Sequence, residues 1–150
     1  MPTDAVDHLQ SFLALTVVGV ILTAAFSAYT NSLTQSSEAI KLRDILHQVA
    51  AKATAALETL TEDNATVNVV LSLPLKIGNK DYWIRISNDS SYAWVEGGFG
   101  SPFTESEQDF RVYLPKNALA SGTFEGEYQL AQISCVMNGS TPQLTLGRKE

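Results

Sequence analysis

The sequence is poor in cysteine, in cationic side chains and, over its N-terminal part, in charge of either sign. Its 150 residues include one cysteine, which excludes an intrachain disulfide. Ten Lys and Arg against sixteen Asp and Glu give a formal net charge of −6, which argues against binding to nucleic acid. No proline lies between Thr3 and Leu60, and no charged residue lies between Leu9 and Ser37. This last absence is the most informative, because a helix in water needs a polar face.

The uncharged stretch is long enough to cross a bilayer. Its densest part, from Phe12 to Tyr29, matches the ~20 apolar residues that span the hydrocarbon core as a helix. Asp4 and Asp7 precede it, in a first helical turn where the helix dipole favours anions. We therefore expect a helix that lies in lipid or among other helices. The core helix of a soluble protein is disfavoured, because a small β region cannot cover a helix that is apolar on every side.

The N-terminus differs from an ordinary secretory signal peptide, which has a basic beginning and a short apolar core. The first cation of the chain is Lys41, after the apolar run. Either the segment stays attached, or a short basic leader has already been removed. Lys41 and Arg43 would favour a cytoplasmic C-terminal region under the positive-inside rule, which counts against an outward-facing one.

Beyond Ser37 the apolar pattern becomes periodic, with alternating spacings of four and three that are typical of a helix packed on one face. We predict one helix from about residue 4 to about residue 61, roughly 85 Å long. The residues predicted to pack in a helical core are Phe12, Leu13, Leu15, Val17, Val18, Gly19, Ile21, Leu22, Phe26, Leu42, Leu46, Val49, Ala53 and Leu60.

The rest of the chain alternates with the period of β-strands, after a polar turn at 61–66. A loop is predicted at 97–102, a tight turn at 77–80 and a hairpin at Asn138-Gly139. The predicted fold class is α+β: an N-terminal apolar helix in residues 1–61, then a small antiparallel, immunoglobulin-like β-sandwich in residues 62–150. The predicted strands are 67–73, 81–87, 92–96, 110–114, 126–137 and 143–146.

No group of side chains indicates catalysis, a metal site or a cofactor. His8 and His47 have no cysteine or carboxylate partners at metal-ligand spacing. Glu105, Glu107 and Asp109 favour an exposed acidic loop, because a calcium loop needs more oxygen ligands in a fixed order. Cys135 lies in an alternating strand, which favours a buried, inert thiol. We therefore expect a protein that is not an enzyme and uses no cofactor.

Three N-x-S/T sequons begin at Asn64, Asn88 and Asn138, all at predicted turns of the β region. They are candidate N-glycosylation sites and would suit an extracytoplasmic domain. The alternative is that Asn, Ser and Thr simply mark turns.

The layout of the whole chain resembles archaeal type IV pilin-like proteins, including archaellum filament subunits. Leu71-Ser-Leu-Pro-Leu-Lys-Ile-Gly-Asn-Lys-Asp-Tyr82 is similar to the Leu-Pro…Ile-Gly…Tyr strand–turn–strand segment of many such proteins, and Val112-Tyr-Leu-Pro115 to a second feature. The resemblance implies a structural subunit of an extracellular filament for adhesion or motility, inserted in the membrane before assembly. Its helix would bundle with copies of itself, and its β domain would form the surface.

A second hypothesis stays open, because the class III cleavage site of that family is not visible in the sequence. It is a membrane-anchored binding module of the cell envelope whose helix remains in lipid. The periodic segment 42–60 distinguishes the two hypotheses. If copies pack on it, Ala53→Glu should abolish assembly without unfolding the β region, whereas an anchor should tolerate that change unless the segment packs on its own sandwich.

Overall fold

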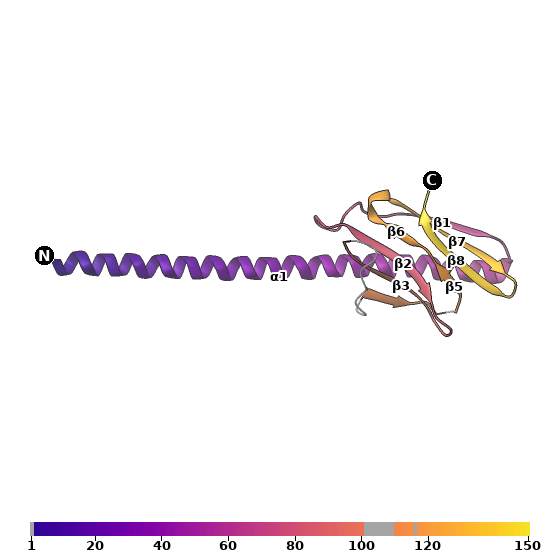
Figure 1. Cartoon of the computed structure of the whole chain (residues 1–150), viewed down its shortest axis with the longest axis horizontal. Helices are drawn as coiled ribbons and strands as arrows, with labels where there is room; N and C mark the ends of the chain where they lie inside the picture. The colour runs from indigo at the N-terminus through magenta and orange to yellow at the C-terminus, as the bar shows by residue number, and fades with distance from the viewer. Residues whose placement is uncertain (1, 101–109, 116) are drawn as a thin grey trace. The chain divides into compact units, whose positions relative to one another are not determined.

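The computed structural model describes residues 2–100, 110–115 and 117–150 (Figure 1). The chain divides between Ser37 and Glu38 into two compact units, so the second half of the helix belongs with the sheets. The elements are α1 (Pro2–Asp63), β1 (Val67–Ser72), β2 (Tyr82–Asn88), β3 (Ala93–Phe99), β4 (Arg111–Tyr113), β5 (Leu119–Ser121), β6 (Thr123–Glu125), the 3-10 helix η2 (Gly126–Tyr128), β7 (Leu130–Asn138) and β8 (Thr141–Arg148).

One continuous helix runs through both units, as the uninterrupted pattern predicts. Asp4 lies in its first turn, where a negative charge complements the helix dipole. At the other end, Asn64 adopts a left-handed conformation with φ 50°, and its N–H donates to the carbonyl of Leu60 at 2.9 Å. Asparagine tolerates this conformation, and the bond satisfies a carbonyl that the helix end leaves without a partner.

Two four-stranded sheets follow, in the orders β1-β7-β8-β5 and β4-β3-β2-β6. Their pairs are antiparallel except β5 with β8, which is parallel. The chain passes from one sheet to the other at Gly122, between β5 and β6, with φ +117°. A Cβ at Gly122 would lie 2.0 Å from the carbonyl oxygen of Leu146, so a side chain has no room there.

The second half of α1 and both sheets share one apolar core. Buried helix residues from Leu42 to Leu60 form a single cluster with Ile84 and Val95 of one sheet and Ile133 and Leu144 of the other. Figure 1 shows the strands of both sheets gathered alongside this part of the helix. Contact is close at β3, where a Cβ on Gly97 would lie 2.9 Å from Cδ2 of Leu46. The periodic face of the helix is therefore the third wall of the core.

The architecture confirms the α+β class with antiparallel-rich sheets after one long helix. The loop predicted from residue 97 is wrong at its start, because Gly97 to Phe99 complete β3. Glycine is needed in this strand, since Leu46 crosses Gly97 and the ring of Trp83 lies against Gly98. The strands β5 and β6 were not predicted, and residues 126–128 form η2 instead of a strand. Glu105, Glu107 and Asp109 lie outside the described residues.

Candidate functional site: the exposed apolar segment of the helix

The first half of α1 exposes its apolar side chains in the single chain. Every residue from Thr3 to Ser37, named here the apolar segment, is exposed. Its large hydrophobic side chains are 49% to 72% accessible: Val6, Leu9, Phe12, Leu13, Leu15, Val17, Val18, Val20, Ile21, Leu22, Phe26, Tyr29 and Leu33. Burying each of them stabilises a protein by roughly 1.5–3 kcal/mol, so the segment has tens of kcal/mol to gain from being covered.

Four threonine hydroxyls of the apolar segment are already partnered within the helix. Thr16 donates to the carbonyl of Phe12 at 2.9 Å, and Thr23 donates to that of Gly19 at 2.8 Å. Thr30 repeats the same bond one heptad later, to Phe26 at 2.9 Å. A donor that is satisfied by its own helix costs little to bury, so these threonines are compatible with lipid or with a neighbouring helix.

By length and composition α1 can cross a membrane, and 0% of its most apolar window is buried within the chain. Gly19, near the middle of the apolar segment, has no atom within 4 Å of the position that a Cβ would take. The apolar segment is therefore a large apolar surface that needs lipid or another protein to cover it.

The structure divides the fourteen predicted packing residues into two groups. Those from Phe12 to Phe26 lie in the exposed apolar segment. The other five are 0–1% accessible and lie in the chain's own core: Leu42, Leu46, Val49, Ala53 and Leu60. The expectation that this second group packs against other copies is corrected, because its own sheets already cover it.

The boundary between exposed and buried helix coincides with the first charge after the uncharged run. Glu38 is 7% accessible, and its Oε2 lies 2.8 Å from Nζ of Lys80. Lys80 closes the turn predicted at 77–80, in which Ile77 and Lys80 exchange backbone hydrogen bonds of 3.1 Å. Gly78 in that turn has φ +61°, and a Cβ there would lie 2.7 Å from Glu38. The ion pair therefore anchors the start of the core unit, residues 38–150.

The three sequons differ in how free their asparagines are. Asn64 and Asn138 are exposed, at the end of α1 and in the β7–β8 turn. Asn88 is half-buried, and its Oδ1 accepts a hydrogen bond from the N–H of Ala120 at 3.0 Å. The Asn88 side chain thus joins β2 to β5, and the other two are the more accessible for a glycan.

Residues that could support chemistry are dispersed over the part of the chain that the structure describes. His8 and His47 are exposed, and no group of three His, Cys, Asp or Glu among the described residues is placed to hold a metal ion. Cys135 is buried as predicted, and burial raises the pKa of its thiol, which disfavours the reactive thiolate.

Sequence reasoning missed a ladder of aromatic and arginine side chains on the β4-β3-β2-β6 sheet. Glu96 is buried and accepts from Arg85 at 2.6 Å and from Arg111 at 3.2 Å. The Arg111 guanidinium lies 4.5 Å from the ring centre of Trp94, which is 6.0 Å from that of Tyr113. The available signal was alternation, since Arg85 lies between the buried Ile84 and Ile86, and Trp94 lies between the buried Ala93 and Val95.

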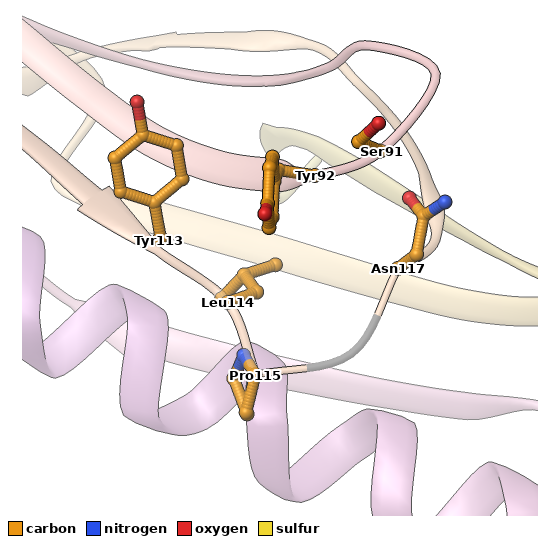
Figure 2. Close-up of a pocket in the computed structure, with 6 residues that line it drawn as sticks. All are labelled: Ser91, Tyr92, Tyr113, Leu114, Pro115 and Asn117. Atoms are coloured by element: carbon orange, nitrogen blue, oxygen red, sulfur yellow. The ribbon is translucent and has the colours of Figure 1, made fainter.

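Beyond Tyr113 the sheet ends in a pocket of about 490 Å³, lined by Ser91, Tyr92, Tyr113, Leu114, Pro115 and Asn117 (Figure 2). Comparison with protein-family models, curated proteins and solved structures found no match to this chain. Among the described residues, the apolar segment and this pocket are two candidate surfaces for function.

Proposed function

We propose that the chain is a structural subunit of an extracellular, type IV pilin-like filament. In this proposal the apolar segment is inserted in the membrane before assembly and is then buried among the same segments of other copies. The observation that carries the proposal is the contrast within one helix. Residues 3–37 are all exposed and largely apolar, whereas the continuation of the same helix is packed in the chain's own core.

Packing among copies is supported by the composition of the segment. Small residues let helix backbones approach closely, and Gly19, Ala24, Ala25 and Ala28 provide them near its middle. The threonine hydroxyls are satisfied inside the helix, so helix–helix contact leaves none of those donors without a partner. Identical subunits joined by heterologous contacts that do not close into a ring form helical filaments.

The core unit would form the filament surface. We propose that its two sheets act as the immunoglobulin-like head of that filament family, with Asn64 and Asn138 as its N-glycosylation sites. Both asparagines are exposed, which favours them over Asn88. The proposed partners are thus copies of the chain in the filament and the membrane before assembly. The proposed role is adhesion or motility, without catalysis, cofactor or nucleic acid.

A membrane-anchored binding module of the cell envelope is the second candidate. The length of the uncharged run favours it, because a single span in lipid needs the same ~20 apolar residues. In that case the apolar segment would contact lipid permanently, and small residues along it would have no packing role.

Electron microscopy of material sheared from the native cells, with peptide mass spectrometry on the same fraction, tests the proposal. Regular fibres that contain this chain are expected. If the chain stays wholly in the membrane pellet while other filaments shear off, the subunit proposal fails and the anchored module replaces it.

A matched pair of variants separates the two candidates further. Gly19→Ile and Ala25→Ile add apolar bulk, so membrane insertion is retained in both cases. Close helix packing is lost at the face that copies share, because a larger side chain holds the backbones apart. The filament proposal expects fewer fibres for at least one variant, with the protein still in the membrane. Normal fibres from both would contradict close packing at these residues.

A further inference from the structure

A pocket in the core unit has the composition of a ligand site. It lies where the β2–β3 turn meets the residues that follow β4. Its volume of about 490 Å³ lies within the ~300–1,000 Å³ typical of small-molecule sites. Figure 2 shows Tyr113 at one end of the pocket, Asn117 at the other, and Tyr92, Leu114 and Pro115 between them.

The turn that presents Tyr92 is held by hydrogen bonds before any ligand arrives. Oδ1 of Asp89 accepts from the N–H of Ser91 at 2.7 Å and from that of Tyr92 at 2.6 Å. The N–H of Asp89 donates to the carbonyl of Tyr92 at 2.9 Å, and that of Leu114 donates to Ala93 at 2.8 Å. A site ordered in this way loses little conformational entropy on binding.

The aromatic side chains of the pocket are exposed to solvent, and other side chains pack against them. Tyr92 and Tyr113 are 59% and 56% accessible, and their ring centres are 6.0 Å apart with 77° between the ring planes. Tyr113 also contacts Trp94, which Arg111 covers at 4.5 Å. Two half-exposed rings at nearly a right angle therefore offer apolar faces that are fixed in place.

The polar groups of the described lining residues are uncharged. The described lining residues bring two phenol hydroxyls, the hydroxyl of Ser91 and the amide of Asn117, and none of them is charged. The charges of Asp89 and Arg111 beside this lining have opposite signs and are already engaged, Asp89 by the N–H groups of Ser91 and Tyr92 and Arg111 by Glu96. A wholly apolar ligand would take hydroxyl and amide groups out of water without returning hydrogen bonds, which costs free energy.

We propose that this pocket binds a neutral carbohydrate. A sugar ring combines an apolar C–H face, which suits Tyr92 and Tyr113, with hydroxyls that can pair with Ser91 and Asn117. The proposal goes beyond the filament proposal and does not depend on it, because the pocket belongs to the core unit of a single chain. The sugar could be a free saccharide or a glycan attached to another copy, and the same chemistry recognises both.

The test uses the full chain in micelles of a zwitterionic detergent, because sugar-based detergents would compete. Mannose, galactose, N-acetylglucosamine and their disaccharides are titrated by saturation-transfer NMR and calorimetry. Saturable binding is expected, and Tyr113→Ala should weaken it about tenfold, equivalent to about 1.4 kcal/mol. Asn117→Ala should weaken it several-fold. The matched control is Tyr128→Ala, which removes a tyrosine that is 44% accessible and lies over Arg148, away from the pocket.

The experiment has two arms: a chain that lacks glycans because of Asn64→Gln and Asn138→Gln, and the glycosylated chain. If the chain without glycans binds a free saccharide, the site is supported and its ligand is a free sugar. If only glycosylated copies self-associate and Tyr113→Ala abolishes this, the site is supported and its ligand is a glycan of another copy. If Tyr113→Ala does not fold, Tyr92→Ala and Ser91→Ala replace it. The proposal is overturned if neither arm shows binding, if binding is unchanged in the pocket variants, or if a proline-rich peptide binds the pocket and saccharides do not.

Discussion

The two halves of one helix make the most instructive comparison in this molecule. Residues 3–37 are exposed on every side and uncharged from Leu9 onward. Beyond the buried Glu38, residues 39–63 carry their charges on exposed faces and bury a single face against two sheets. Periodic apolar residues marked the half that is covered within the chain. Uniform apolar composition marked the half that needs a cover from elsewhere.

The largest expected effect on stability comes from a charge introduced into residues 38–63, the half of the helix with periodic apolar residues. Ala53 is fully buried between helix and sheets, so Ala53→Glu should unfold the core unit, with a loss of more than about 3 kcal/mol. Chemical denaturation of the full chain followed by circular dichroism measures this. An unchanged unfolding midpoint, with assembly alone lost, would restore the original expectation that copies cover this face.

A charge in the uniform half should instead affect insertion. Ile21→Asp places a carboxylate in the apolar segment, at a cost of about 2.5–3.5 kcal/mol for a helix centre in a bilayer. The core unit should unfold as in the wild type, while the fraction of chain in the membrane falls. Gln48→Asp, on an exposed part of the same helix, is the matched control and should change neither. If Ile21→Asp and Gln48→Asp lowered the membrane-bound fraction equally, the division of the helix into two halves would be contradicted.

Removing one buried hydrogen bond of the core unit should lower its stability by a smaller amount. The buried Tyr82 hydroxyl donates to the carbonyl of Pro74, so Tyr82→Phe should cost about 0.5–1.5 kcal/mol. Burial raises the pKa of Tyr82 to about 12, so its contribution is complete below the ordinary tyrosine pKa and is lost as the pH rises through the raised value. Alkaline titration of the unfolding free energy should therefore show a loss that Tyr82→Phe reduces. If Tyr82→Phe loses as much unfolding free energy at alkaline pH as the wild type, Tyr82 is not the group responsible for that loss.

The smallest expected effect is a pH dependence confined to the pocket turn. The backbone N–H groups of Ser91 and Tyr92 lower the pKa of Asp89, so the turn is stabilised above the ordinary carboxyl pKa and loses that support as the pH falls through the lowered one. NMR signals of Tyr92 should shift in that acid range and stay fixed in Asp89→Asn, whose amide oxygen can still accept. Tyr92 signals that shift equally in Asp89→Asn would contradict the assignment.

Local pattern was enough to predict much of the fold. The helix, the turn at 77–80, the hairpin after Asn138 and the buried Cys135 all follow from residues close together in sequence. The hairpin loop is Gly139-Ser140, one residue later than the predicted Asn138-Gly139, and Gly139 takes φ +66° at its first position.

Long-range pairing could not be predicted in the same way. The run Gly97-Gly98 has the composition of a loop, and it is a strand because Leu46 and Trp83 need room there. The short strands β5 and β6 depend on partners in two different sheets. Periodicity between Leu42 and Leu60 shows that one helix face is buried, without showing what buries it. The pocket at Tyr92 and Tyr113 likewise exists only once β4 pairs with β3.

Single-cysteine cross-linking in native cells tests the central claim most directly. In a chain with Cys135→Ala, cysteines are placed singly from residue 12 to residue 29 and, for comparison, at Val49, and a short bifunctional thiol reagent is added. The account predicts ladders of cross-linked copies from at least one face of the apolar segment and none from Val49, which its own sheets cover. Ladders from Val49, or monomers at every position from 12 to 29, would contradict it.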